Sequence, residues 1–209
     1  MGFDEYGCER ISIWSCWFCC RDDRDWLSSN SGRYRLLPSS AAVRVSCFAT
    51  VHPLKRSRTS TGLLIFRNKG DALEVLLVHP GGPYFRNKDN GFWTIPKGEI
   101  GEDEDLVSRA RMEFEEELGI AAPTGKLIEL GSVKQKGGKA VHAWALEGDL
   151  RDDFKLLSNT FEMEWPPHSG KLERFPEIDR AVFFPIERAK TKINAAQKIF
   201  IDRLISALE

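Results

Sequence analysis

One stretch of the chain, residues 93–120, limits the possible folds most strongly, because it joins a glycine loop to a strongly acidic helix. The consecutive acidic residues Glu102 to Asp105 suit the positive N-terminal end of a helix dipole, and Gly119 is typical of a helix C-terminus. We therefore predict the end of a strand, a glycine loop, a helix that begins near residues 102–105, and a stop at Gly119.

The predicted helix has two different faces. One is apolar and consists of Val107, Ala110, Phe114 and Leu118. On another face Glu113, Glu116 and Glu117 share an arc of about 100°. Glutamate runs are most often solvated helix faces, but like charges at these spacings repel unless a cation lies between them. Clustered carboxylates also suit Mg²⁺ or Mn²⁺. The helix alone is therefore consistent with two interpretations, a solvated face and a metal site.

The spacing of this stretch resembles the Nudix box, in which glycine, glutamate and apolar positions recur in a fixed order around the sequence Arg-Glu. Eight of the nine specified positions match, namely Gly98, Glu104, Glu113, Phe114, Glu116, Glu117, Gly119 and Ile120. The ninth is Met112, where the family has an arginine that helps to hold and orient the glutamates. Arg109 lies one turn before Glu113, and we expect it to supply part of the missing charge by an i,i+4 pair.

The resemblance covers residues 59–209 and implies an α/β fold, a Nudix-like α/β/α sandwich with a mixed β-sheet. It also implies a site made by the glutamates of the box. Glu113, Glu116 and Glu117 would bind Mg²⁺ or Mn²⁺, with the carbonyl of Gly98 as a further ligand. Glu104 would support this catalytic set, and Glu113 or Glu117 would take the proton from the attacking water.

Candidate substrate-binding residues lie on both sides of the box. Lys97 and Arg86 would hold the leaving phosphate. Lys136, at a predicted hairpin tip, could reach an anionic substrate, although lysines there are more often solubilising. Trp165 lies in residues 149–177, which we interpret as a long loop that either grips a ring by stacking or packs as a surface flap.

The implied reaction is metal-dependent hydrolysis of a diphosphate linkage in a nucleoside diphosphate linked to a moiety X, so the chain would be a Nudix-type pyrophosphohydrolase with a small-molecule nucleotide substrate. The lead-in Trp-Thr-Ile-Pro-Lys-Gly-Glu is most similar to enzymes of nucleoside or dinucleoside polyphosphates. The alternative is a catalytically weakened nucleotide-binding or regulatory module, in which Met112 marks lost catalysis. The three retained, mutually repelling carboxylates argue against it.

Residues 1–58 differ in composition from the rest, and we predict a poorly ordered N-terminal extension. A targeting segment, a nucleic-acid contact through the basic run 55–58, and a metal knuckle at Cys16 and Cys19 are alternatives. All five cysteines lie in the first quarter of the chain, which favours a reducing, cytoplasmic setting over a disulfide framework. The net charge of −1 gives no general attraction to nucleic acid, and no apolar run is long enough to span a membrane.

Around the box the sequence predicts further regular elements. Strands are expected at 62–66 and 73–78 as a hairpin, at 126–134 and 140–146 as a second hairpin, and at 178–184. Another strand should end at residues 93–96. A short helix is expected at 185–190, followed by an amphipathic helix capped by Asn194.

Overall fold

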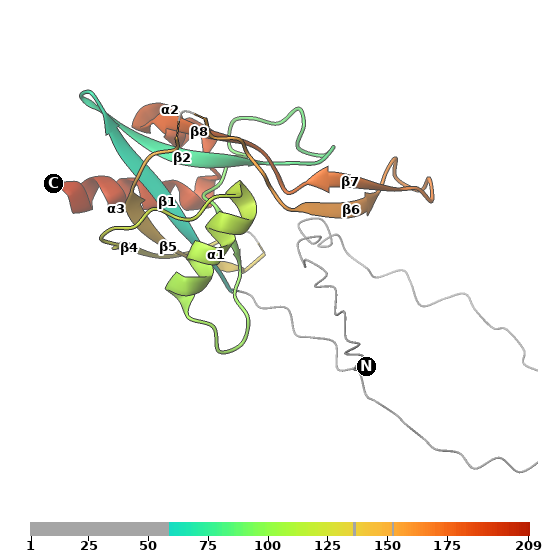
Figure 1. Cartoon of the computed structure of the whole chain (residues 1–209), viewed down its shortest axis with the longest axis horizontal. Helices are drawn as coiled ribbons and strands as arrows, with labels where there is room; N and C mark the ends of the chain where they lie inside the picture. The colour runs from blue at the N-terminus through green and yellow to red at the C-terminus, as the bar shows by residue number, and fades with distance from the viewer. Residues whose placement is uncertain (1–58, 136, 152) are drawn as a thin grey trace, which may run out of the picture.

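The computed structural model describes residues 59–135, 137–151 and 153–209, which form a six-stranded sheet, three α-helices and a separate hairpin (Figure 1). The sheet strands are β1 (Thr59–Lys69), β2 (Ala72–Pro80), β3 (Lys97–Glu99), β4 (Ile128–Lys134), β5 (Ala140–Glu147) and β8 (Ile178–Pro185). Their order is β4-β5-β1-β2-β8, and β3 pairs with β1. Because β1 and β5 are parallel while the other pairs are antiparallel, the sheet is mixed, as predicted.

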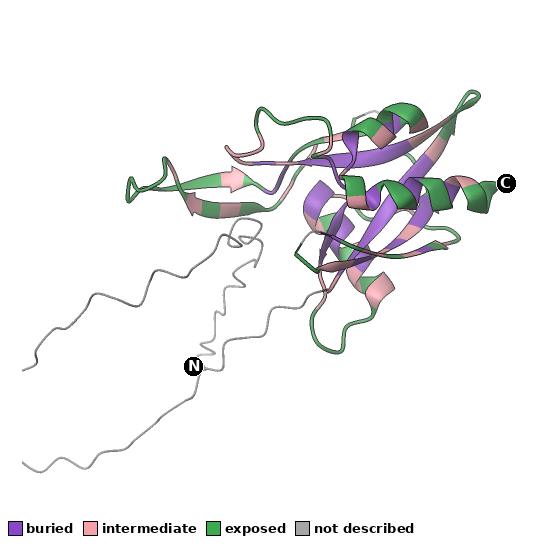
Figure 2. Cartoon of the chain, turned by 180° about the vertical axis from the view of Figure 1, so that it is seen from behind, coloured by how far each residue is buried: buried purple, intermediate pink, exposed green. Residues whose placement is uncertain are grey.

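Helices cover both faces of the sheet. Helix α1 (Leu106–Leu118) packs on one face, and α2 (Ile186–Lys192) and α3 (Lys198–Leu208) pack on the other. Consecutive residues of β1 alternate between the two cores: Leu63 and Ile65 face α1, and Leu64 and Phe66 face α3. A strand covered on both faces is apolar throughout, which explains the continuous buried centre of β1 in Figure 2. The predicted α/β/α sandwich is confirmed.

Helix α1 begins one residue after the predicted acidic segment. Its N-cap is Asp105, whose carboxylate accepts a hydrogen bond from the amide of Ser108 at 2.8 Å. This contact lowers the pKa of Asp105. Gly119 ends the helix in the left-handed region, with φ of 75°, as expected for a glycine C-cap.

The strand next to the box lies later in the chain than predicted. We expected it to end at residues 93–96, but β3 begins at Lys97 and pairs with Ser60 to Gly62 of β1. The glycine at position 62 allows the two backbones to come this close, because a Cβ at Gly62 would lie only 2.4 Å from the carbonyl oxygen of Pro96. Residues 93 and 94 form only isolated bridges.

The segment 149–177 is not the continuous loop that we predicted. It contains β6 (Thr160–Glu164) and β7 (Leu172–Pro176), which pair antiparallel as a two-stranded hairpin. In Figure 1 this hairpin extends away from the sheet. Phe161 and Met163 are half-buried and alternate with exposed glutamates, so a period-2 pattern was present in the sequence.

The C-terminal elements differ slightly from the prediction. The side chain of Asn194 accepts a hydrogen bond from the amide of Ala196, and so caps a short 3₁₀ turn (Ala195–Gln197) that leads into α3. The predictions for residues 1–58, including Cys16 and Cys19, lie outside the described residues. In the described ranges no helix is both long and apolar enough to cross a membrane.

Candidate active site

The glycine loop of the box lies directly against helix α1. A Cβ at Gly98 would lie 1.8 Å from the carboxyl group of Glu113, so no side chain fits at this position. The amide of Lys97 donates a hydrogen bond to Glu117 Oε2 at 3.2 Å. Strand β3 and helix α1 therefore form one unit, in which backbone groups of the loop meet glutamates of the helix.

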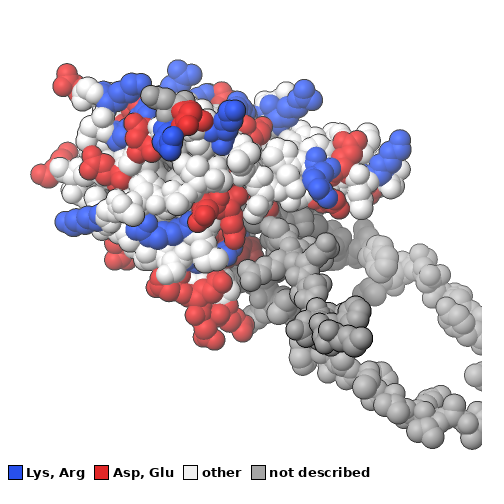
Figure 3. All heavy atoms as spheres, in the orientation of Figure 1, with Lys and Arg blue, Asp and Glu red and all other residues white. Residues whose placement is uncertain are grey.

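The three glutamates of α1 differ in exposure. Glu113 is 2% exposed and Glu117 is fully buried, whereas the side chain of Glu116 is 39% exposed. Burial of two carboxylates on a helix that also packs Phe114 into the core excludes the solvated-face interpretation for Glu113 and Glu117. Figure 3 shows another acidic group at the lower edge of the domain, where the exposed residues 102–105 precede α1.

Burial changes the protonation of both inward carboxylates. Desolvation raises the pKa of Glu113 to about 7, with the Arg109 guanidinium opposing the shift. Desolvation also raises the pKa of Glu117 well above its ordinary value, against the attraction of Lys97. The pKa of Lys97 is lowered for the same reason. The site is therefore short of positive charge, and an additional cation would stabilise both carboxylates in their ionised form.

Arg109 is a cation that the chain itself supplies to the glutamates. Its Nη2 atom donates to Glu113 and, at 3.2 Å, to Glu116, and its Nε lies 3.9 Å from Glu104. The predicted i,i+4 pair with Glu113 is confirmed. Met112 is 45% exposed. Arg109 therefore contacts three of the four box glutamates from one turn earlier than the family's arginine.

The donor set fits a hard divalent cation. Oε1 of Glu117 is buried and has no hydrogen-bond partner among the described residues, so it is an acceptor in need of a cation or donor. Glu113 lies beside it on the same face of α1, at the Gly98 backbone. Within the described ranges no group of three or more His, Cys, Asp or Glu side chains is already assembled as a metal cluster. In this structure Glu113 and Glu116 both contact the Nη2 atom of Arg109.

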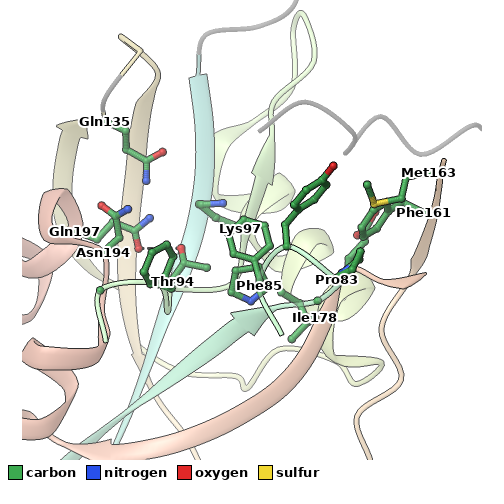
Figure 4. Close-up of a pocket in the computed structure, with 17 residues that line it drawn as sticks. Pro83, Phe85, Thr94, Lys97, Gln135, Phe161, Met163, Ile178, Asn194 and Gln197 are labelled. Carbon is green, nitrogen blue, oxygen red and sulfur yellow. Dashed lines mark hydrogen bonds between the residues drawn. The ribbon is translucent and has the colours of Figure 1, made fainter. Parts of the chain in front are cut away.

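A cavity of about 180 Å³ lies beside the glutamates. Lys97, which is 3% exposed, belongs to both the cavity and the glutamate site, because it lines the cavity and its backbone contacts Glu117. In Figure 4 polar side chains lie at one end, with Gln135, Asn194 and Gln197, and apolar side chains at the other, with Phe161 and Met163. Sequence reasoning did not identify the glutamines, because they come from β4–β5 and from the turn before α3.

Two other predicted substrate residues, Arg86 and Trp165, do not line the cavity. Arg86 is exposed in the loop that follows β2, and Lys136 lies outside the described residues. The indole of Trp165 packs edge-to-face on Tyr84, with 5.3 Å between ring centroids. Tyr84 lines the cavity, whereas the cavity lining does not include Trp165.

His79 fixes the loop that carries Arg86. It is fully buried at the end of β2, with its Nδ1 2.6 Å from Asp179 Oδ1 and its Nε2 2.7 Å from the carbonyl oxygen of Lys88. Asp89 is held as well, by the side chains of Trp93 and Lys192. His79 is thus a structural contact of the loop, and its ring nitrogens do not face the cavity.

Comparison with known proteins agrees with this geometry. The family model described as NUDIX domain matches residues 56–204. The chain belongs to this family. The Nudix domain is thus confirmed by a match that extends well beyond the box, and with it the assignment of the chain as a pyrophosphohydrolase enzyme. No curated protein sequence matches the chain.

Solved structures share the fold at low sequence identity. The C. elegans Ap4A hydrolase binary complex is 21% identical with a TM-score of 0.51, over 71% of this chain and 97% of that one. The NUDIX domain of Shewanella oneidensis NrtR, complexed with ADP ribose, is 15% identical with a TM-score of 0.50, over 74% and 90%. The MutT protein from Methanosarcina mazei Go1 is 22% identical with a TM-score of 0.49, over 76% and 99%.

Proposed function

We propose that this Nudix domain hydrolyses a diphosphate linkage in a nucleoside or dinucleoside polyphosphate, with Mg²⁺ or Mn²⁺ as cofactor. The observation that carries the proposal is the pair of buried carboxylates, Glu113 and Glu117, against the backbone of Gly98 and Lys97 respectively, with one Glu117 oxygen lacking a partner among the described residues. A buried carboxylate oxygen without a partner is costly, which favours a site that a cation completes.

The residues proposed to hold the cation are Glu113, Glu116 and Glu117, together with the Gly98 carbonyl. When bound, a divalent cation neutralises charge on the diphosphate and lowers the pKa of water. Glu113 or Glu117 accepts the proton of the attacking water. Glu104 acts through Arg109, to which it lies within 3.9 Å, and so positions the other carboxylates.

The proposed substrate contacts are arranged around the cavity. Lys97 lies between the glutamates and the cavity, where its side chain can meet a phosphate. Arg86 and Lys136 remain predicted phosphate contacts. Trp165 remains a predicted stacking residue, and its packing on Tyr84 brings it next to the cavity wall.

The substrate class rests on the lead-in to the box and on the fold shared with a protein called Ap4A hydrolase. We therefore place dinucleoside polyphosphates first in a substrate panel, followed by nucleoside triphosphates, nucleotide sugars and ADP-ribose. Cleavage yields a nucleoside monophosphate and phosphorylated X, or the corresponding split of a longer polyphosphate.

The test is phosphate or nucleotide release from this panel with and without Mg²⁺ or Mn²⁺, for wild type, Glu116→Gln and Glu115→Gln. Glu115 is an exposed neighbour on the same helix and serves as the matched control. We expect metal-dependent cleavage of one class, a loss of more than about 100-fold in Glu116→Gln, and little change in Glu115→Gln. Folded wild-type protein that binds a nucleotide but cleaves nothing would favour the regulatory module instead.

A further inference from the structure

The chain has only two glutamines, Gln135 and Gln197, and both are buried in the wall of the cavity beside the active site. Gln135, directly after β4, is 8% exposed, and Gln197 is fully buried in the turn before α3. In both, the side-chain Nε2 atom is buried without a hydrogen-bond partner among the described residues. A buried amide donor without an acceptor is costly, so two in one cavity indicate a ligand that supplies acceptors.

The orientation of Gln197 is fixed by its neighbours. Its Oε1 accepts hydrogen bonds from the hydroxyl of Thr94 at 2.9 Å and from the backbone amide of Ile95 at 3.1 Å. Turning the amide over would place an NH₂ group against the backbone N–H of Ile95, so Nε2 must be the free end. The side chain of Asn194 is oriented in the same way, because its Oδ1 accepts a hydrogen bond from the amide of Ala196 and its NH₂ group is the other end. This end of the cavity therefore offers donors (Figure 4).

Aromatic and other apolar side chains form much of the remaining cavity lining. Phe85, Phe92, Phe161 and Met163 are among its lining residues. The cavity volume of 180 Å³ compares with about 150 Å³ for a cavity that accepts a benzene ring. Lys97 lines the cavity and its backbone contacts Glu117, so the phosphates attached to a bound base would extend past Lys97 toward the glutamates. Base and phosphates can thus occupy adjoining parts of one site.

We infer that this cavity binds the base of the nucleotide and that Gln197 and Gln135 select a base edge with neighbouring acceptors, so that among purines guanine is preferred to adenine. Guanine presents O6 and N7, both acceptors, on one edge, whereas adenine presents N7 and the N6 amino donor. A donor facing the N6 amino group would lose its hydrogen bond. The inference rests on the proposed function for one point, that the ligand is a nucleotide. It adds which base the site prefers.

Binding of guanosine and adenosine 5′-monophosphates, measured by calorimetry, tests this inference without turnover. Wild type is expected to bind the guanosine nucleotide about tenfold more tightly. Gln197→Glu keeps the acceptor for Thr94 and Ile95 but turns the free end into an acceptor, so it should abolish this preference. Gln135→Met, which removes the other donor, should reduce it.

Two controls separate folding and catalysis from base selection. Glu129→Gln, an exposed change on β4, should keep the wild-type preference, and thermal melting reports whether each variant folds. Glu116→Gln should keep the base preference even where hydrolysis is lost. Equal binding of both nucleotides by wild type, no binding of either, or an unchanged preference in a folded Gln197→Glu variant would each overturn the inference. Cleavage without base preference would overturn it while the proposed function stands.

Discussion

Arg109 is the residue on which this variant of the Nudix box depends. Its guanidinium contacts Glu113, Glu116 and Glu104. We expect Arg109→Ala to lower kcat/KM about 10- to 100-fold, because residues that orient metal ligands have effects of this size. Steady-state kinetics checks this. Arg111→Ala is the matched control, since Arg111 on the same helix donates to the carbonyl of Pro123.

Met112→Arg restores the motif arginine and tests whether Arg109 already compensates for it. If compensation is complete, turnover of Met112→Arg should stay within about twofold of wild type, and the same change should recover part of the activity of Arg109→Ala. A large gain in turnover in the wild-type background would show that methionine at position 112 lowers the activity of the site. Failure to rescue Arg109→Ala would show that position 112 does not reach the glutamates.

Glu113 makes the stability of the folded protein depend on pH, and the direction of this dependence follows from its pKa. In metal-free protein its folded pKa of about 7 lies above the ordinary value of 4.5, so between these values the folded state holds a proton that the unfolded state has released. The free energy of unfolding should therefore fall as pH rises through this window. Glu113→Gln cannot ionise, so its Tm should fall less from about pH 5 to about pH 8, by about 2–4 °C per kcal/mol removed. Parallel Tm profiles for both proteins would contradict this assignment.

At the scale of elements, the contact of β3 with α1 has no room for a side chain. Gly98→Ala would place a Cβ 1.8 Å from the Glu113 carboxyl group, so either the loop or the carboxylate must move. We expect activity to fall by more than about 100-fold, because a displacement of about 1 Å at a reacting group is enough for such a loss. Gly125→Ala is the control, because a Cβ there meets only Leu146, at 3.3 Å. Normal activity in Gly98→Ala would contradict the described contact.

The β6–β7 hairpin should contribute binding rather than chemistry. Phe161 lines the cavity and packs on Phe175, with ring centroids 6.1 Å apart. Phe161→Ala should raise KM about 5- to 10-fold and leave kcat nearly unchanged, since an apolar contact of about 1 kcal/mol or more is lost from the bound ring. Leu172→Ala, on the exposed side of the hairpin, should change neither constant. A fall in kcat alone for Phe161→Ala would place the hairpin in the chemical step.

The elements also show what the sequence could predict. Helix α1 was predictable because its apolar face and glutamates recur with helical spacing within one short segment. The β6–β7 hairpin was missed, although Phe161, Met163 and Trp165 alternate with Glu162 and Glu164, because prolines and glycines nearby favoured a loop. The position of β3 depends on its pairing with β1, which local pattern does not specify.

At the scale of the whole molecule, the sheet brings together residues that are far apart in the chain. Gln135 directly follows β4 and Gln197 directly precedes α3, yet both line one cavity with Lys97, the residue before Gly98 of the box. No local spacing connects these three residues, so the cavity could not be predicted, whereas the glutamates could. The two cores on opposite faces of β1 hold this arrangement, with α1 presenting the carboxylates on one side and α3 closing the other.

The central claim is that the inward glutamates of α1 hold a divalent cation, and Mn²⁺ binding measured by calorimetry tests it most directly. Wild type, Glu117→Gln and Glu115→Gln would be titrated at about pH 8, where the carboxylates are most ionised. We predict that Glu117→Gln weakens Mn²⁺ binding more than about tenfold while Glu115→Gln binds like wild type. Equal Mn²⁺ affinity in all three folded proteins would contradict the account.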